Sequence, residues 1–126
     1  MAKTRNRPVY LNLFQIRFPA TAVVSIGHRI AGVLLSLMIP LLIYLLDLSL
    51  HGPMEYQQAL SILHSVWFRV IAVVLIWAFA HHFFAGIRFL VIDLGIRVDE
   101  HAVHRSAWLV HGATLVVVLA RVLLLW

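Results

Sequence analysis

The sequence predicts an all-α membrane protein with three transmembrane helices. Hydrophobic residues make up 63% of the 126 residues and charged residues only 12%, whereas soluble domains are about half apolar and about a quarter charged. A chain this short cannot bury so much apolar surface in one water-soluble core. The composition therefore excludes an ordinary soluble domain, a disordered tail and a nucleic-acid-binding module.

The three predicted spans follow from the lengths of the apolar stretches. A spanning helix needs about 20 apolar residues, because the hydrocarbon core is about 30 Å thick and a helix rises about 1.5 Å per residue. Lipid offers the backbone no hydrogen bonds, so each stretch is expected to be helical. The predicted spans are about 30–50, 66–94 and 107–126, in a transmembrane region of residues 30–126 that follows a basic N-terminal segment of residues 1–29.

Positive charge is distributed unevenly around these spans. The net charge is +5, from 10 Lys and Arg against 5 Asp and Glu, and the connection of residues 51–65 has no Lys or Arg. The cations gather before the first span and around the second connection: Lys3, Arg5, Arg7, Arg17, Arg29, Arg88, Arg97 and Arg105. Cytoplasmic loops of membrane proteins are enriched in Lys and Arg. We therefore expect a cytoplasmic N-terminus and second connection, with residues 51–65 and the C-terminus outside.

Polar and small residues share one helical face where the first span begins. The positions i, i+4, i+7 and i+11 hold Ser25, Arg29, Gly32 and Ser36. The Ser25 hydroxyl and the Arg29 guanidinium could together bind a carbonyl or carboxylate ligand at the membrane edge. The same spacing fits an interfacial arginine beside a stripe of close helix packing. Spacing alone leaves both interpretations open and favours packing.

Eight histidines stand out in a chain that has no cysteine. Without thiolates, imidazole is the remaining side chain suited to binding haem iron. His82 lies inside the second span, in a shallow trough formed by Ala78, Ala85 and Gly86. A haem edge or a closely approaching helix would fit that trough, and an interhelical hydrogen bond is an equal alternative role for the imidazole.

The other histidines have less specific surroundings. His81 points about 100° away from His82 and is expected to face bulkier side chains or lipid. His28, beside Arg29 at the membrane edge, suits a haem propionate better than iron. The remaining five fit no metal-ligand pattern and are interpreted as structural or interfacial: His51, His64, His101, His104 and His111.

Two patterns occur in the blocks RPVYLNLFQIRFPATAVVSIGHRIAG (7–32) and HFFAGIRFLVIDLG (82–95). Together they resemble the cytochrome b membrane anchor, of proteobacterial type, of succinate:quinone oxidoreductase (succinate dehydrogenase, respiratory complex II). The family pattern S-x-x-H-R-x-x-G is met by Ser25, His28, Arg29 and Gly32. The pattern H-x-x-x-G-x-R-H-x-x-x-D is met by His82, Gly86, Arg88 and Asp93, with Phe89 where the family often has histidine.

The resemblance implies a place in a hetero-oligomeric helix bundle of the bacterial cell inner membrane. Its partners would be a companion membrane anchor, an iron–sulfur protein and a flavoprotein of the same complex. His82 would be an axial ligand of a haem b iron shared with the companion anchor, with His28 and Arg29 at the haem propionates. A ubiquinone-binding site would include Ser25, Arg29, Ile26 and Phe18. The chain would be a subunit of succinate dehydrogenase (quinone), with no catalytic residue and no complete active site of its own.

Three alternatives remain open. The chain could anchor a fumarate reductase that works with a quinol, since the direction of catalysis depends on potentials that a sequence does not display. It could also be a haem-free structural anchor for a soluble dehydrogenase. A small transporter has the least support, because Asp47, near the outer end of the first span, is the only acidic candidate.

Overall fold

The computed structural model describes residues 17–96 and 98–125, and every secondary-structure element within them is a helix. The elements are α1 (Ala20–Leu50), α2 (Pro53–His64), α3 (Val66–Asp93) and α4 (Glu100–Leu125). By length and composition, α1, α3 and α4 are able to cross a membrane. The predicted all-helical fold with three long apolar helices is confirmed. Four of the cations behind the predicted orientation lie outside the described residues: Lys3, Arg5, Arg7 and Arg97.

Helix α1 begins at Ala20, well before the apolar stretch that starts near Ile30. Pro19 stands at the N-cap with extended backbone and has no N–H to leave unpaired there. The residues that follow lack a helix breaker until Gly27, so the helix extends from the membrane-edge segment directly into the apolar span. The first sequence motif therefore lies entirely within one regular helix.

The connection of residues 51–65 contains a helix that apolar length alone does not reveal. Helix α2 starts with Pro53 in its first turn, after Gly52 at φ +152°, a conformation that favours glycine. Ser65 ends α2 and begins α3, because its hydroxyl donates to the Ile62 carbonyl at 2.7 Å and accepts from the Phe68 N–H at 3.2 Å. These cap signals identify the short helix more clearly than its hydrophobicity does.

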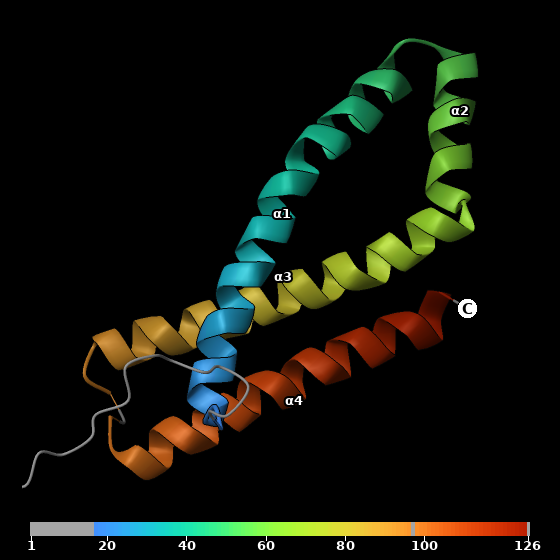
Figure 1. Cartoon of the computed structure of the whole chain (residues 1–126). Coiled ribbons are helices and arrows are strands. Elements are labelled where there is room, and N and C mark those ends of the chain that lie inside the picture. The colour runs from blue at the N-terminus through green and yellow to red at the C-terminus, as the bar shows by residue number, and fades with distance from the viewer. Residues whose placement is uncertain (1–16, 97, 126) are drawn as a thin grey trace, which may run out of the picture.

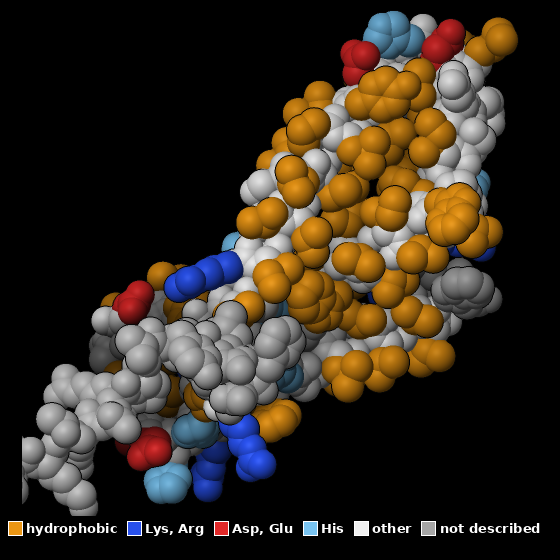
Figure 2. Space-filling model, in the orientation of Figure 1, with side chains coloured by type: hydrophobic (Ala, Val, Ile, Leu, Met, Phe, Trp, Pro, Cys, Tyr) orange, Lys and Arg blue, Asp and Glu red, His pale blue; other side chains and the backbone are white. Residues whose placement is uncertain are grey.

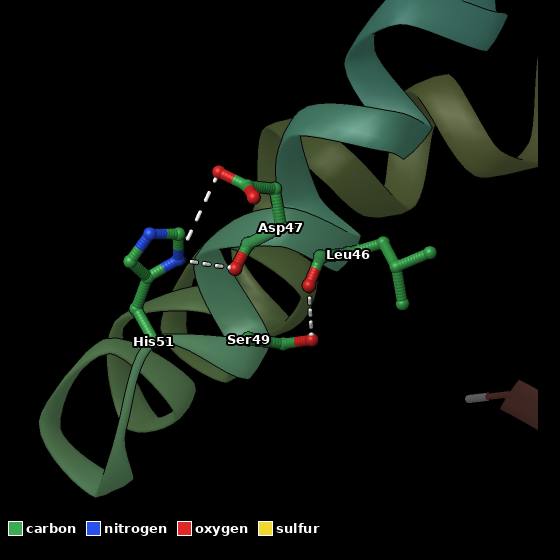
Figure 3. Close-up of polar contacts among 4 residues, drawn as sticks. All are labelled: Leu46, Asp47, Ser49 and His51. Atoms are coloured by element: carbon green, nitrogen blue, oxygen red, sulfur yellow. Dashed lines mark hydrogen bonds and ion pairs between the residues drawn. The ribbon is translucent and has the colours of Figure 1, made fainter.

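Side chains cap the C-terminal end of α1 by hydrogen-bonding its last carbonyl groups, as Figure 3 shows. Nδ1–H of His51 donates to the Asp47 carbonyl at 2.7 Å, and the Asp47 carboxylate lies 3.8 Å from the same nitrogen. The Ser49 hydroxyl donates to the Leu46 carbonyl at 2.7 Å. The hydrogen bond to the Asp47 carbonyl and the charge of its carboxylate raise the pKa of His51 above its ordinary value. A protonated His51 therefore stabilises the negative end of the helix dipole.

Helix α3 is the central helix of the chain, because it packs along α4 and crosses the N-terminal half of α1 (Figure 1). The buried core at this meeting point consists of Val24, Ala85, Ala107 and Val110. Beyond the crossing, α1 and α3 diverge, and α2 connects their far ends (Figure 1). At the other end of α3, Gly95 has φ +73°, and the N–H groups of Gly95 and Ile96 donate to the carbonyls of Ile92 and Val91. This pair of bonds is a Schellman motif, which ends α3 and turns the chain toward α4.

On the face shown in Figure 2, hydrophobic side chains cover the upper and right-hand parts of the molecule, and most of the visible charged side chains lie at the top and at the lower left. Most of the large apolar residues on α1, α3 and α4 are exposed within the single chain. An exposed apolar surface of this extent is suited to lipid or to neighbouring helices rather than to water.

Candidate functional site

The crossing of α1 and α3 brings the two sequence motifs together. Nδ1 of His82 lies 3.1 Å from the main-chain carbonyl oxygen of His28, and the two imidazole rings stack with centroids 4.0 Å apart and planes 9° apart. A carbonyl oxygen only accepts, so Nδ1 of His82 must carry the hydrogen. The bond joins α3 to α1 and is the interhelical hydrogen bond that the sequence left open as an alternative role for His82. In the neutral ring, Nε2 then bears the lone pair that a metal ion requires.

Gly32 allows this close crossing, whereas Gly86 leaves room for a methyl group. A Cβ atom added at Gly32 would lie 3.1 Å from Cε1 of His82, and one added at Gly86 would lie 3.6 Å from Nε2 of His28. The other residues of the trough, Ala78 and Ala85, are fully buried. The trough predicted beside His82 is therefore filled by α1 of the same chain. The sequence left two possible occupants for this trough, a haem edge or a closely approaching helix. In the structure, the occupant is a helix, α1.

His81 lies where α1, α3 and α4 meet. Its ring stacks on Trp77 and lies 5.5 Å from the ring of His111, which confirms the bulky neighbours predicted for it. The alternative, a side chain facing lipid, is wrong because only 2% of His81 is exposed. Its Nε2 donates to the Val24 carbonyl at 3.4 Å, and Nδ1 is buried with no hydrogen-bond partner among the described residues. Because His81 points in a different direction from His82, its ring faces α4. The sequence could not predict where α4 packs against α3.

The two adjacent histidines differ in what they offer a ligand. His81 has its lone pair on the enclosed Nδ1, whereas His82 is only partly buried and has its lone pair on Nε2. No group of three or more His, Asp or Glu side chains able to hold a metal ion occurs in the part of the chain that the structure describes. A metal held here would be bound through one imidazole, which is the way a protein chain contributes an axial ligand to haem.

Ser25 and Arg29 occupy one face of α1, at the end where the helix begins. Ser25 is half-buried and Arg29 is exposed. Within residues 17–96 and 98–125, neither side chain makes a hydrogen bond or ion pair, whereas the Ser36 hydroxyl donates to the Gly32 carbonyl at 2.9 Å. The other two predicted lining residues, Ile26 and Phe18, are each 45% exposed. Three of these four side chains are exposed and none is buried, so a ligand bound there needs walls from other molecules.

Arg88, the arginine of the second motif, joins α3 to α4. Its Nε donates to the Ser106 hydroxyl at 3.0 Å and its Nη2 to the Val103 carbonyl at 3.1 Å, and the residue is buried. Phe89, which departs from the family pattern, meets the ring of His28 edge-on at 5.2 Å. Sequence reasoning missed the contact of Arg88 with α4 and the contact of Phe89 with His28. Nothing in the local pattern connects Arg88 with a serine 18 residues away.

Residues 3–121 of the chain match the model of the succinate dehydrogenase/fumarate reductase transmembrane subunit family. The chain belongs to this family. It is also 41% identical over 90 residues to the succinate dehydrogenase cytochrome b556 subunit of Coxiella burnetii (strain RSA 493 / Nine Mile phase I), an alignment that covers 71% of this chain and 72% of the relative. The resemblance to the complex II cytochrome b anchors is thus confirmed.

Membership of a succinate dehydrogenase/fumarate reductase transmembrane subunit family, together with three long apolar helices, makes this chain a multi-pass membrane protein. In this protein, the two family motifs are the two sides of one helix crossing. His28 and Gly32 of the first motif contact His82 of the second, and Gly86 of the second lies against His28 of the first.

Proposed function

We propose that this membrane protein anchors a succinate:ubiquinone oxidoreductase, binds the iron of haem b through His82 and contributes to the ubiquinone site. The observation that carries the proposal is the hydrogen bond from Nδ1 of His82 to the His28 carbonyl. This bond fixes the ring and leaves Nε2 free to bind a metal, as backbone carbonyls do for metal-bound histidines. The adjacent His81 lacks this arrangement because its free nitrogen is enclosed.

Because α1 fills the trough beside His82, a haem shared with another chain would bind the part of His82 that remains exposed. His28 packs flat against the His82 ring and supports its orientation. Arg29 is exposed beside His28, and a guanidinium is a strong partner for a propionate carboxylate. The companion membrane anchor would supply the second axial ligand. When bound, haem supplies one-electron transfer chemistry, and this chain sets the orientation and basicity of one ligand.

The quinone site rests on Ser25 and Arg29. The Ser25 hydroxyl has no partner among the described residues and is available to donate a hydrogen bond to a quinone carbonyl. Arg29 would stabilise the negative charge that develops on the ring as electrons arrive from the iron–sulfur protein, a contribution of several kcal/mol in a poorly solvated site. Ile26 and Phe18 would provide apolar contact. The missing walls of this open surface would come from the iron–sulfur protein and the companion anchor, with the flavoprotein docked beyond.

The chain's orientation and location are part of the same proposal. The exposed Arg29 and Arg105 lie toward the end of the molecule where α1 and α4 begin. The positive-inside rule places that end, and the N-terminus, in the bacterial cytoplasm. Oxidation of succinate would take place in the peripheral proteins of the complex, so the isolated anchor would hold no complete active site.

The haem assignment is tested by replacing each adjacent histidine in the assembled complex. His82→Leu should abolish or strongly shift the reduced-minus-oxidised absorption bands of haem b. His81→Leu is the matched control and should retain them, with the amount of assembled complex measured by immunoblot in both cases. Normal bands of six-coordinate haem in His82→Leu would contradict the assignment and show that the iron is bound by other residues.

The quinone assignment is tested with two serines of the same helix face. Ser25→Ala should lower the quinone reductase activity by at least about tenfold, which corresponds to roughly 1.4 kcal/mol, while haem absorbance stays normal. Ser36→Ala should have little effect, because the Ser36 hydroxyl already donates to the Gly32 carbonyl. Equal quinone reductase activity in the two variants would show that Ser25 does not contribute to the quinone site.

A fumarate reductase anchor that works with a quinol is the second candidate, because the matched family includes fumarate reductase subunits. The quinone that copurifies with the complex distinguishes the two functions. Ubiquinone supports the proposed direction, and menaquinone as the sole quinone supports fumarate reduction.

A further inference from the structure

A groove lies between α3 and α4, apart from the candidate site. Its volume is about 590 Å³, and all of its lining residues belong to α3, α4 and the turn between them. His82 and Gly86, which contact His28 and Gly32 of α1, are not among the lining. The groove is therefore distinct from the His28–His82 contact, although Phe84 and Val110 of its lining pack in the core with Val24 of α1.

The groove combines an apolar depth with a charged mouth. Its depth is lined by buried or half-buried apolar residues of both helices: Phe84, Val91, Val110 and Ala113. Its mouth lies where α3 ends and α4 begins and is lined by the exposed Asp99, His101 and Arg105, and the buried Arg88 also lines the groove. The end of two spanning helices coincides with the boundary between the hydrocarbon core and the headgroups. The groove thus runs from that boundary into the apolar layer.

The charge of the mouth favours an anion. The lining contains two arginines and one aspartate, which gives a net charge of +1. The Asp99 carboxylate is already engaged, because Oδ2 accepts from the Ala102 N–H at 3.0 Å at the positive end of the α4 dipole. Arg88 is held in place by its bonds to Ser106 and Val103, whereas Arg105 and His101 are exposed and able to approach a ligand.

We propose that this groove binds one anionic phospholipid from the leaflet at that end of the molecule. The phosphate would lie between Arg105 and His101, beside the fixed charge of Arg88, and an acyl chain would occupy the apolar depth. Arginine is well suited to phosphate because its planar fork matches the oxygen atoms. A free phosphate ion would gain nothing from the apolar depth. The choice of an anionic lipid rests on the excess of arginine at the mouth.

Native mass spectrometry of the delipidated membrane complex that contains this chain provides the test. The probes are phosphatidylglycerol and phosphatidylcholine with identical acyl chains. The wild type should bind one phosphatidylglycerol in preference to phosphatidylcholine, and Arg105→Ala should weaken that binding about fivefold, the loss expected for one basic residue near a lipid headgroup. Arg121→Ala removes a cation near the opposite end of α4 and should leave the binding unchanged.

A second variant tests the groove without changing charge. Ala113→Phe would fill part of the apolar depth and should also reduce phosphatidylglycerol binding. Three results would overturn the proposal: equal binding of the two lipids, the same loss in Arg105→Ala and Arg121→Ala, or displacement of the lipid by millimolar inorganic phosphate alone. The last result would show that the mouth binds phosphate from solution and that the apolar depth contributes nothing.

Discussion

His28 contacts His82 in two ways, through its imidazole ring at a centroid distance of 4.0 Å and through its main-chain carbonyl at 3.1 Å from Nδ1. The carbonyl survives any substitution of the side chain, whereas the ring does not. Mutation can therefore separate the hydrogen bond that fixes the tautomer of His82 from the packing that fixes its orientation.

The first prediction uses that separation. His28→Phe should keep the haem b spectrum, because the carbonyl remains and a phenyl ring can replace the stacked imidazole. His28→Ala should lower the midpoint temperature of haem loss by several degrees, since an aromatic pair contributes about 0.5–1.5 kcal/mol beyond its buried area. Thermal loss of the haem absorption band in detergent measures both. If His28→Phe loses the haem as completely as His82→Leu does, the imidazole of His28 has a polar role that stacking does not describe.

The second prediction concerns the space that Gly27 leaves for His81. A Cβ atom at Gly27 would lie 2.6 Å from Nε2 of the buried His81, so Gly27→Ala should destabilise the α1–α3 contact by about 1–3 kcal/mol, the usual cost of overpacking. Gly112→Ala is the control, because nothing lies within 4 Å of that position. Thermal unfolding in detergent gives the comparison. Adding His81→Ala to Gly27→Ala should recover part of the loss, and a lack of recovery would locate the clash elsewhere.

The third prediction concerns the Arg88 contact between α3 and α4. Ser106→Ala leaves the buried Nε–H of Arg88 without its acceptor, so the free energy of unfolding should fall by about 1–3 kcal/mol. Ser61→Ala serves as the control, because the Ser61 hydroxyl is exposed and bonds only within α2. The midpoint of chemical unfolding in detergent measures both variants. Equal stability of the two would show that the Arg88–Ser106 bond has no net effect.

The fourth prediction is a pH dependence at the C-terminal end of α1. The pKa of His51 is raised by its hydrogen bond to the Asp47 carbonyl and by the nearby carboxylate. A raised folded-state pKa means that the protonated form stabilises the fold. This stabilisation is complete below the ordinary value of 6.5 and is lost as pH rises through the raised pKa. NMR titration of the His51 ring in detergent should give a midpoint above 6.5.

Asp47→Asn provides the control for that titration. The substitution removes the charge but keeps the main-chain carbonyl, whose hydrogen bond is the larger cause of the raised pKa. The midpoint of His51 should therefore fall only in part. A midpoint below 6.5 in the unmodified chain would mean that the contact seen in Figure 3 does not persist in solution.

Sequence reasoning was successful where a local pattern carries the information. The long apolar stretches predicted helices because lipid leaves the backbone no other way to satisfy its hydrogen bonds. The two motifs identified the family, which the family match confirms. The same reasoning missed α2, since a short helix of mixed polarity has no strong periodic signal, and only Gly52, Pro53 and Ser65 mark its limits.

Chain order alone determined that His81 and His82 are adjacent, that both lie in an apolar helix and that small residues flank them. The tertiary structure decided which of the two is enclosed. That outcome depends on where α1 and α4 cross α3, because a rotation of about 100° between neighbouring residues turns one imidazole toward both helices and leaves the other at their edge. The tautomer of His82 was decided in the same way, by a carbonyl 54 residues distant in the chain.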